Sequence, residues 1–198
     1  MIETHNIETK THGRYLVKRR TSQRLLVGFH GYAENAEKHL AELEKLELDW
    51  TLVAVQGLHR FYARGDQDVV ASWMTRQDRE DAISDNIEYV RRVVDAMAPY
   101  DTLAFLGFSQ GAAMAYRAAA YIGCSGVIVL GGDLPPDVPS LAVPVLIGRG
   151  EHDGWYTGEK LKKDLKSLPH ASTCAFDGGH EWSDEFRGAA SEFLRRLK

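Results

Sequence analysis

The sequence has few cysteines and no long apolar run. Only two cysteines, Cys124 and Cys174, occur among 198 residues, and both lie in apolar surroundings. Two are too few for a disulfide framework, so we expect buried free thiols in a reducing compartment and a cytoplasmic protein. No apolar stretch approaches the roughly 20 residues needed to cross a bilayer, and residues 1–5 lack the basic-then-apolar plan of a signal peptide. We therefore expect no membrane span.

The chain also lacks an excess of positive charge. It has 24 lysines and arginines against 28 aspartates and glutamates, a formal net charge of −4. The basic residues are scattered, apart from short clusters such as Lys18-Arg19-Arg20, which we interpret as a solvated strand end. A nucleic-acid partner is therefore not expected. There is no internal repeat or low-complexity segment, and the length predicts a single domain over residues 1–198.

What the chain does contain is an alternation of strand-like and helical segments. The apolar positions Ile83, Ile87, Val90 and Val94, for example, have helical spacing. We predict strands at 14–18, 24–29, 50–55, 102–108, 126–130, 143–147 and 172–176, and helices at 36–46, 81–97, 112–120, 156–168 and 183–197. The first two strands are compatible with a hairpin. The alternation predicts an α/β fold with a mostly parallel central sheet and helices on both faces, and functional residues gather at the carboxyl ends of such strands.

A serine lies in a tight turn between a predicted buried strand and a predicted helix. The segment is Gly107-Phe108-Ser109-Gln110-Gly111, with a glycine two residues to either side of Ser109. Side chains at the two glycine positions would collide in so sharp a turn, which holds the serine hydroxyl exposed. The start of the following helix offers free N–H groups to an oxyanion. The pattern predicts a nucleophilic serine; the alternative is a serine that caps a helix between two packing glycines.

A serine nucleophile needs a base, usually a histidine. Three histidines follow Ser109 in the sequence: His152, His170 and His180. His180 lies in Asp177-Gly178-Gly179-His180, directly after the last predicted strand, and is the favoured base because nucleophile, acid and histidine follow one another in this order in such folds. His170 precedes a strand and should lie at the opposite edge of the sheet, whereas His152 remains a weaker alternative.

The acid that orients the histidine should also follow a strand. Asp153, in Gly150-Glu151-His152-Asp153, meets this requirement. Glu151 in the same loop and Asp133 after the preceding strand are competitors. Asp133 can also be explained as a turn residue before Pro135. We favour Asp153 and leave Asp133 open.

The loop Phe29-His30-Gly31-Tyr32 follows a central strand and suits the remaining part of an oxyanion hole. One donor in this type of site comes from such a loop and the other from the residue after the nucleophile. We assign the backbone N–H groups of Tyr32 and Gln110. His30 precedes the serine in sequence and is interpreted as a residue that shapes the loop.

Residues 57–80 form the longest stretch without clear periodicity. Long irregular segments are often functional loops, so we predict that Trp73 and Met74 line an acyl pocket with Phe61 and Tyr62 near its mouth. A hydrophobic cluster beneath a long loop explains these residues equally well.

Together these segments resemble the phospholipase/carboxylesterase family of the α/β-hydrolase superfamily, which includes acyl-protein thioesterases. The resemblance rests on the nucleophile segment 107–115, on His30-Gly31, on the acid loop 150–153 and on the histidine loop 177–180. The sequence departs from the common family pattern at Tyr32-Ala33-Glu34, Ala112 and Gly154-Trp155. The resemblance implies the minimal α/β-hydrolase fold, without a large lid, and the catalytic triad Ser109, Asp153 and His180, with no metal or organic cofactor.

The expected function is a serine-dependent carboxylic-ester hydrolase that forms an acyl-enzyme on small or medium acyl esters of small molecules. An acyl thioesterase or lysophospholipase is the alternative within the same chemistry. A non-catalytic ligand-binding protein on this fold is the alternative outside it. Apolar positions on the final predicted helix are compatible with a homodimer, although core packing explains them as well.

Overall fold

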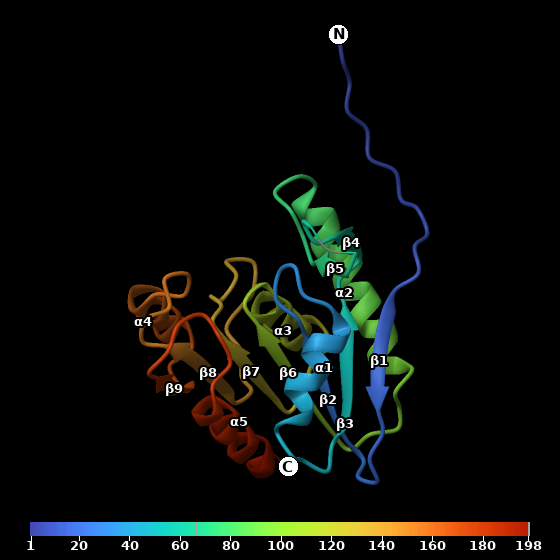
Figure 1. Cartoon of the computed structure of the whole chain (residues 1–198). Helices are drawn as coiled ribbons and strands as arrows, with labels where there is room; N and C mark the ends of the chain where they lie inside the picture. The colour runs from blue at the N-terminus through green and yellow to red at the C-terminus, as the bar shows by residue number, and fades with distance from the viewer. Residues whose placement is uncertain (66, 198) are drawn as a thin grey trace.

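The computed structural model describes residues 1–65 and 67–197, and its centre is a seven-stranded sheet (Figure 1). The strand order is β1-β3-β2-β6-β7-β8-β9. These strands are β1 (Arg14–Lys18), β2 (Arg24–Phe29), β3 (Thr51–Gln56), β6 (Thr102–Phe108), β7 (Gly126–Leu130), β8 (Val145–Gly150) and β9 (Ser172–Phe176). The helices are α1 (Ala36–Glu44), α2 (Arg79–Asp95), α3 (Gln110–Tyr121), α4 (Gly158–Ser167) and α5 (Asp184–Arg196). The predicted α/β class with a mostly parallel sheet is confirmed.

The first strand does not form the hairpin that we considered. β1 pairs antiparallel with β3, with Tyr15 opposite Val55, while β2 lies parallel between β3 and β6. Burial explains the difference. β2 is apolar and buried on both faces, which suits a central strand, whereas β1 alternates between half-buried and exposed side chains and suits the sheet edge.

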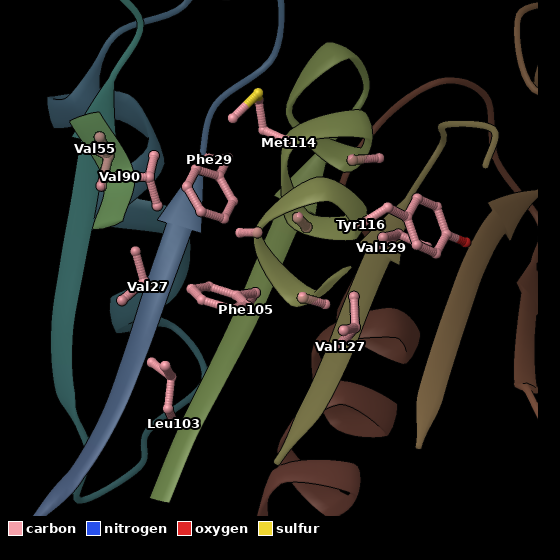
Figure 2. Close-up of a cluster of buried hydrophobic side chains, with 14 of the residues drawn as sticks. Val27, Phe29, Val55, Val90, Leu103, Phe105, Met114, Tyr116, Val127 and Val129 are labelled. Atoms are coloured by element: carbon pink, nitrogen blue, oxygen red, sulfur yellow. The ribbon is translucent and has the colours of Figure 1, made fainter. Parts of the chain in front are cut away.

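Two layers of helices cover the sheet. Helices α2, α3 and α4 pack on one face against side chains such as Val27, Phe105 and Val129, part of the cluster drawn in Figure 2. Helices α1 and α5 pack on the other face, where Leu43 and Phe186 lie in a second core cluster. Successive strand residues alternate between the two clusters, as the pleat of a doubly covered sheet requires.

The segment 57–80 is less irregular than its sequence indicates. It contains a two-stranded antiparallel hairpin of β4 (His59–Tyr62) and β5 (Val69–Ser72). Each strand is too short to show a convincing alternation in sequence. The hairpin connects back to the main fold through a bridge between Glu34 and Ala71. Asp66, between the two strands, lies outside the described residues.

The carboxyl ends of the parallel strands meet at one edge of the sheet. The chain leaves β2 at His30, β6 at Ser109, β7 at Gly131, and it leaves β8 and β9 into the loops that carry Asp153 and His180. β6 lies in the middle of this row, so Ser109 faces loops from strands on both sides. None of the helices in the described ranges is long and apolar enough to cross a membrane.

Candidate active site

Ser109 lies in a strained turn between β6 and α3. Its φ of 55° and ψ of −118° are unusual for a residue other than glycine. A Cβ at Gly107 would lie 2.1 Å from the carbonyl oxygen of Gly111, and a Cβ at Gly111 would lie 2.0 Å from that of Phe29. The two glycines are therefore required by close backbone contacts. α3 begins at Gln110, two residues earlier than predicted, because this turn leads directly into it.

The Ser109 hydroxyl contacts the imidazole of His180. The distance from Ser109 Oγ to His180 Nε2 is 2.7 Å, and His180 Nδ1 lies 2.8 Å from Asp153 Oδ2. An ionised carboxylate can only accept, so Nδ1 carries the imidazole proton and Nε2 is free to accept from the serine hydroxyl. A hydroxyl, an imidazole and a carboxylate in this order have the geometry that a nucleophile, a base and an orienting acid require.

Asp153 is held in place from its other side. Its second carboxylate oxygen, Oδ1, accepts the backbone N–H groups of Trp155 at 2.7 Å and Tyr156 at 2.9 Å. The Asp153 side chain is only 1% exposed, compared with 22% for that of His180. Both carboxylate oxygens thus have fixed partners, and the one facing His180 has little freedom to rotate.

The competing residues are exposed at the surface. Asp133 is exposed and pairs with Lys160 at 3.3 Å, and Glu151 is exposed at the surface. His152 is exposed and contacts Asp177, whereas His170 is exposed in the turn before β9. Among these residues, only Asp133 lies beside the pocket at Ser109.

The two backbone N–H groups predicted as oxyanion donors belong to Tyr32 and Gln110. In the described chain, the N–H groups of Tyr32 and Gln110 donate to no other residue, although those of Ala33 and Glu34 do. The Glu34 carboxylate accepts the Gly31 N–H at 2.7 Å, which fixes the start of the loop. Burial is the main reason that the pKa of Glu34 is raised.

His30 is fully buried and supports the loop. Its Nδ1 contacts the carbonyl oxygen of Gly31 at 2.6 Å, and its Nε2 accepts the Gly57 N–H at 2.9 Å. Burial lowers the pKa of His30, which keeps the ring neutral. A neutral ring with both nitrogens bonded to the backbone has a supporting role in the loop.

The predicted acyl-pocket residues are not brought together at Ser109. Trp73 is fully buried in the first core cluster, and its indole N–H donates to the carbonyl oxygen of His30 at 2.8 Å. Met74 packs against the same cluster. Phe61 lies beside the ring of Tyr32, and Tyr62 is 71% exposed on the hairpin. Trp73 and Met74 thus fit the alternative of a core cluster beneath the segment.

The pocket beside Ser109 has a different lining. It measures about 210 Å³ and is lined by Ser109, Gln110, Ala113, Gly131, Gly132, Asp133, Trp155, Lys160 and His180. We did not predict Trp155 or Lys160, because single residues after a strand and at a helix start carry no pattern. Trp155 lies two residues after the predicted acid, and this proximity is the feature of the sequence that could have placed it at the pocket.

The side chain of Gln110 also has a role that the sequence did not indicate. Its Oε1 accepts from the backbone N–H of Trp73 at 2.9 Å and from the Ser72 hydroxyl at 3.2 Å. Its Nε2 donates to the carbonyl oxygen of Met74 at 3.0 Å. Gln110 therefore ties the end of β5 to the turn that carries Ser109.

Solved structures share this fold over nearly the whole chain. Zea mays acyl-protein thioesterase 2 is 18% identical, with a TM-score of 0.76 over 93% of this chain and 98% of that chain. The Bacillus cereus carboxylesterase is 16% identical, with a TM-score of 0.75 over 93% and 94%. A phospholipase/carboxylesterase from Dyadobacter fermentans is 18% identical, with a TM-score of 0.69 over 96% and 100%. At these identities the similarity establishes the α/β-hydrolase fold.

The sequence itself matches one family. No protein of curated function matches this chain in sequence. The family model described as serine hydrolase (FSH1) matches residues 20–182, a range that contains the Ser109 turn, the Asp153 loop and His180. The predicted serine-hydrolase class is confirmed, and the resemblance to the phospholipase/carboxylesterase group is supported by the structures above. The chain belongs to the serine hydrolase (FSH1) family.

Proposed function

We propose that the protein is a carboxylic-ester hydrolase that works through an acyl-enzyme, with Ser109 as nucleophile, His180 as base and Asp153 as the orienting acid. The observation that carries the proposal is the pair of hydrogen bonds from Ser109 through His180 to Asp153, at 2.7 and 2.8 Å. A serine hydroxyl becomes reactive when a base in contact with it removes the proton.

In the first half-reaction, Ser109 Oγ attacks the ester carbonyl carbon while its proton moves to His180 Nε2. The carbonyl oxygen becomes an oxyanion that accepts the N–H groups of Tyr32 and Gln110. The C–O bond to the leaving group then breaks, and His180 returns the proton to the departing alcohol. The product is an ester between Ser109 and the acyl group.

In the second half-reaction, water takes the place of the alcohol. His180 removes a proton from water as the oxygen attacks the acyl carbon, and the same proton then goes to Ser109 Oγ when that bond breaks. Asp153 remains ionised and stabilises the positively charged imidazole. The net reaction consumes one ester and one water and gives one acid and one alcohol.

A thioester is the second candidate substrate, since the same steps release a thiol. The Zea mays neighbour is an acyl-protein thioesterase of the same fold, which favours including this class among the substrates tested. A non-catalytic binding protein would not need Ser109 in a strained turn with a base at hydrogen-bond distance.

Localisation and assembly are part of the same proposal. Cys124 and Cys174 are free and half-buried, and burial raises the pKa of Cys124 to about 12, so this thiol is unreactive. Free thiols favour the reducing cytoplasm. The homodimer remains a prediction that a sedimentation experiment can test.

Hydrolysis of p-nitrophenyl acetate and butyrate tests the proposed function. We expect turnover by the unmodified protein and a loss of at least about 1,000-fold in kcat in Ser109→Ala. Ser84, exposed on α2, provides the matched control, and Ser84→Ala should retain full activity. No turnover above background on oxygen esters and thioesters would overturn the proposal.

A further inference from the structure

Asp133, Trp155 and Lys160 are among the residues that line the pocket beside Ser109, and these three are called its wall. We propose that this wall selects a short group that carries a hydroxyl, so that the substrates are esters of small hydroxylated acids or of small polyols. The inference rests on the proposed ester hydrolysis and names its substrate class. Three features of the wall support it: its size, its charge and its exposed aromatic ring.

The size of the pocket limits the group to a short one. Its volume of about 210 Å³ lies below the range of roughly 300–1,000 Å³ that is typical for sites of drug-sized ligands. Trp73 and Met74, which could have lined a longer acyl channel, pack in the core instead. A long alkyl chain would therefore extend from this pocket into solvent.

The charges in the wall favour a neutral polar group. Lys160 Nζ lies 3.3 Å from Asp133 Oδ2 and 3.4 Å from Oδ1, and both side chains are about half exposed. A substrate carboxylate attracted to Lys160 would also face Asp133, and a substrate ammonium attracted to Asp133 would face Lys160. A hydroxyl avoids both conflicts because it donates to Asp133 and accepts from Lys160 at once.

Trp155 supplies an apolar surface next to this polar pair. Its side chain is 76% exposed, which is unusual for a tryptophan, although its backbone N–H is fixed to Asp153. An indole face at the rim can cover the C–H groups of a small hydroxylated substrate, whose hydroxyl then reaches the ion pair.

The loop that carries Asp133 is held in place before substrate arrives. The Leu134 N–H donates to Asp164 Oδ2 at 3.0 Å, and the same oxygen accepts the Tyr156 hydroxyl at 2.9 Å. Gly131 has a φ of 65°, and a Cβ there would lie 2.9 Å from the His180 ring. The backbone that carries Asp133 is therefore held next to the reacting groups, which lowers the entropic cost of recognition.

The test uses two pairs of esters of equal shape. In the acyl arm, p-nitrophenyl 3-hydroxybutyrate is compared with p-nitrophenyl 3-methylbutyrate; in the alcohol arm, 2-hydroxyethyl butyrate is compared with propyl butyrate. Each rate is normalised to hydroxide-catalysed hydrolysis. We expect kcat/KM to be about tenfold higher for the hydroxylated ester in one arm, as one or two net hydrogen bonds would give. The arm that responds identifies whether acid or alcohol enters the pocket.

Variants connect the preference to the wall. Lys160→Met and Asp133→Asn should each reduce the hydroxyl preference to less than about threefold. Lys162→Met is the matched control, because Lys162 lies on the same helix, pairs with Glu159 and does not line the pocket; this variant should keep the preference.

Two failures are distinguishable. Hydrolysis of all four esters without a hydroxyl preference would overturn this inference and leave the proposed function intact. The same holds for a preference for the charged ester p-nitrophenyl hemisuccinate, or for octanoyl over butyryl esters. Absence of turnover on every ester would instead overturn the proposed function and the inference with it.

Discussion

Asp153 Oδ2 lies 2.8 Å from His180 Nδ1, although the two residues are 27 positions apart in sequence. The other carboxylate oxygen of Asp153 accepts two backbone N–H groups from its own loop. The contact therefore joins the loops after β8 and β9 through a buried carboxylate that has no freedom to turn away.

Asp153→Asn should lower kcat by about 1,000-fold or more without unfolding the protein, because an amide can stabilise the wrong tautomer of His180. Asp177→Asn is the control, since Asp177 is exposed and its carboxylate pairs with His152 at the surface. The check is steady-state hydrolysis of p-nitrophenyl acetate alongside circular dichroism. A greater loss in Asp133→Asn than in Asp153→Asn would reassign the acid.

Gly111→Ala should lower the free energy of unfolding by about 3 kcal/mol, because the new methyl group would overlap the backbone at Phe29. A Cβ at Gly188 in α5 would face open space, so Gly188→Ala should raise stability by about 0.5–1 kcal/mol. Urea unfolding measures both. Equal effects of the two variants would mean that the turn around Ser109 is looser than described.

Trp73→Ala should destabilise the protein by about 3–5 kcal/mol and reduce activity equally for short and long acyl chains, because the ring fills the core. Tyr62→Ala, at an exposed position, should change stability by less than about 0.5 kcal/mol. Thermal unfolding and a series of acyl lengths are the measurements. A loss restricted to long chains would restore the acyl-pocket interpretation of Trp73.

His39 should make the protein sensitive to acid. Its ring is buried between α1 and the sheet, and burial, with a smaller effect of His30, lowers its pKa from 6.5 to about 3. Unfolding lets the ring bind a proton more easily. The stability that His39 contributes is therefore fully present above pH 6.5 and is lost as the pH falls toward 3.

His39→Leu tests this dependence. Between pH 6.5 and pH 5, the unmodified protein should lose about 1–2 kcal/mol more stability than the variant, measured by urea unfolding at each pH. His170→Leu, at an exposed position, is the control and should follow the unmodified protein. Parallel curves for the His39→Leu variant and the unmodified protein would show that His39 does not carry the acid response.

Strand and helix positions were largely predictable because buried parallel strands are continuous apolar runs and the covering helices are amphipathic. β1, β2, β6, β7 and β9 agree with the predicted ranges, whereas β3 and β8 begin and end one to three residues later than predicted. The pairing of β1 was not predictable, since chain proximity favours β2 while burial favours the edge beside β3. The short strands β4 and β5 were missed for lack of a repeating pattern.

At the site, residues tied to backbone geometry could be located from sequence. The Ser109 turn was predicted from its flanking glycines, and the loops of His180 and Asp153 from their positions after strands. The pocket lining was not predictable, because Trp155 and Lys160 reach Ser109 only through the packing of separate loops. Trp73 is buried in the core, and the sequence could not distinguish this position from one in an acyl pocket because segment 57–80 has no clear periodicity.

The central claim is that Ser109 is the nucleophile activated by His180. The direct measurement is the intact mass of the protein after reaction with a fluorophosphonate, followed by peptide mapping. We predict one adduct, on Ser109, that is absent in Ser109→Ala and forms at least about 100-fold more slowly in His180→Ala. An adduct on another residue, or labelling of Ser109 at the same rate without His180, would contradict the account.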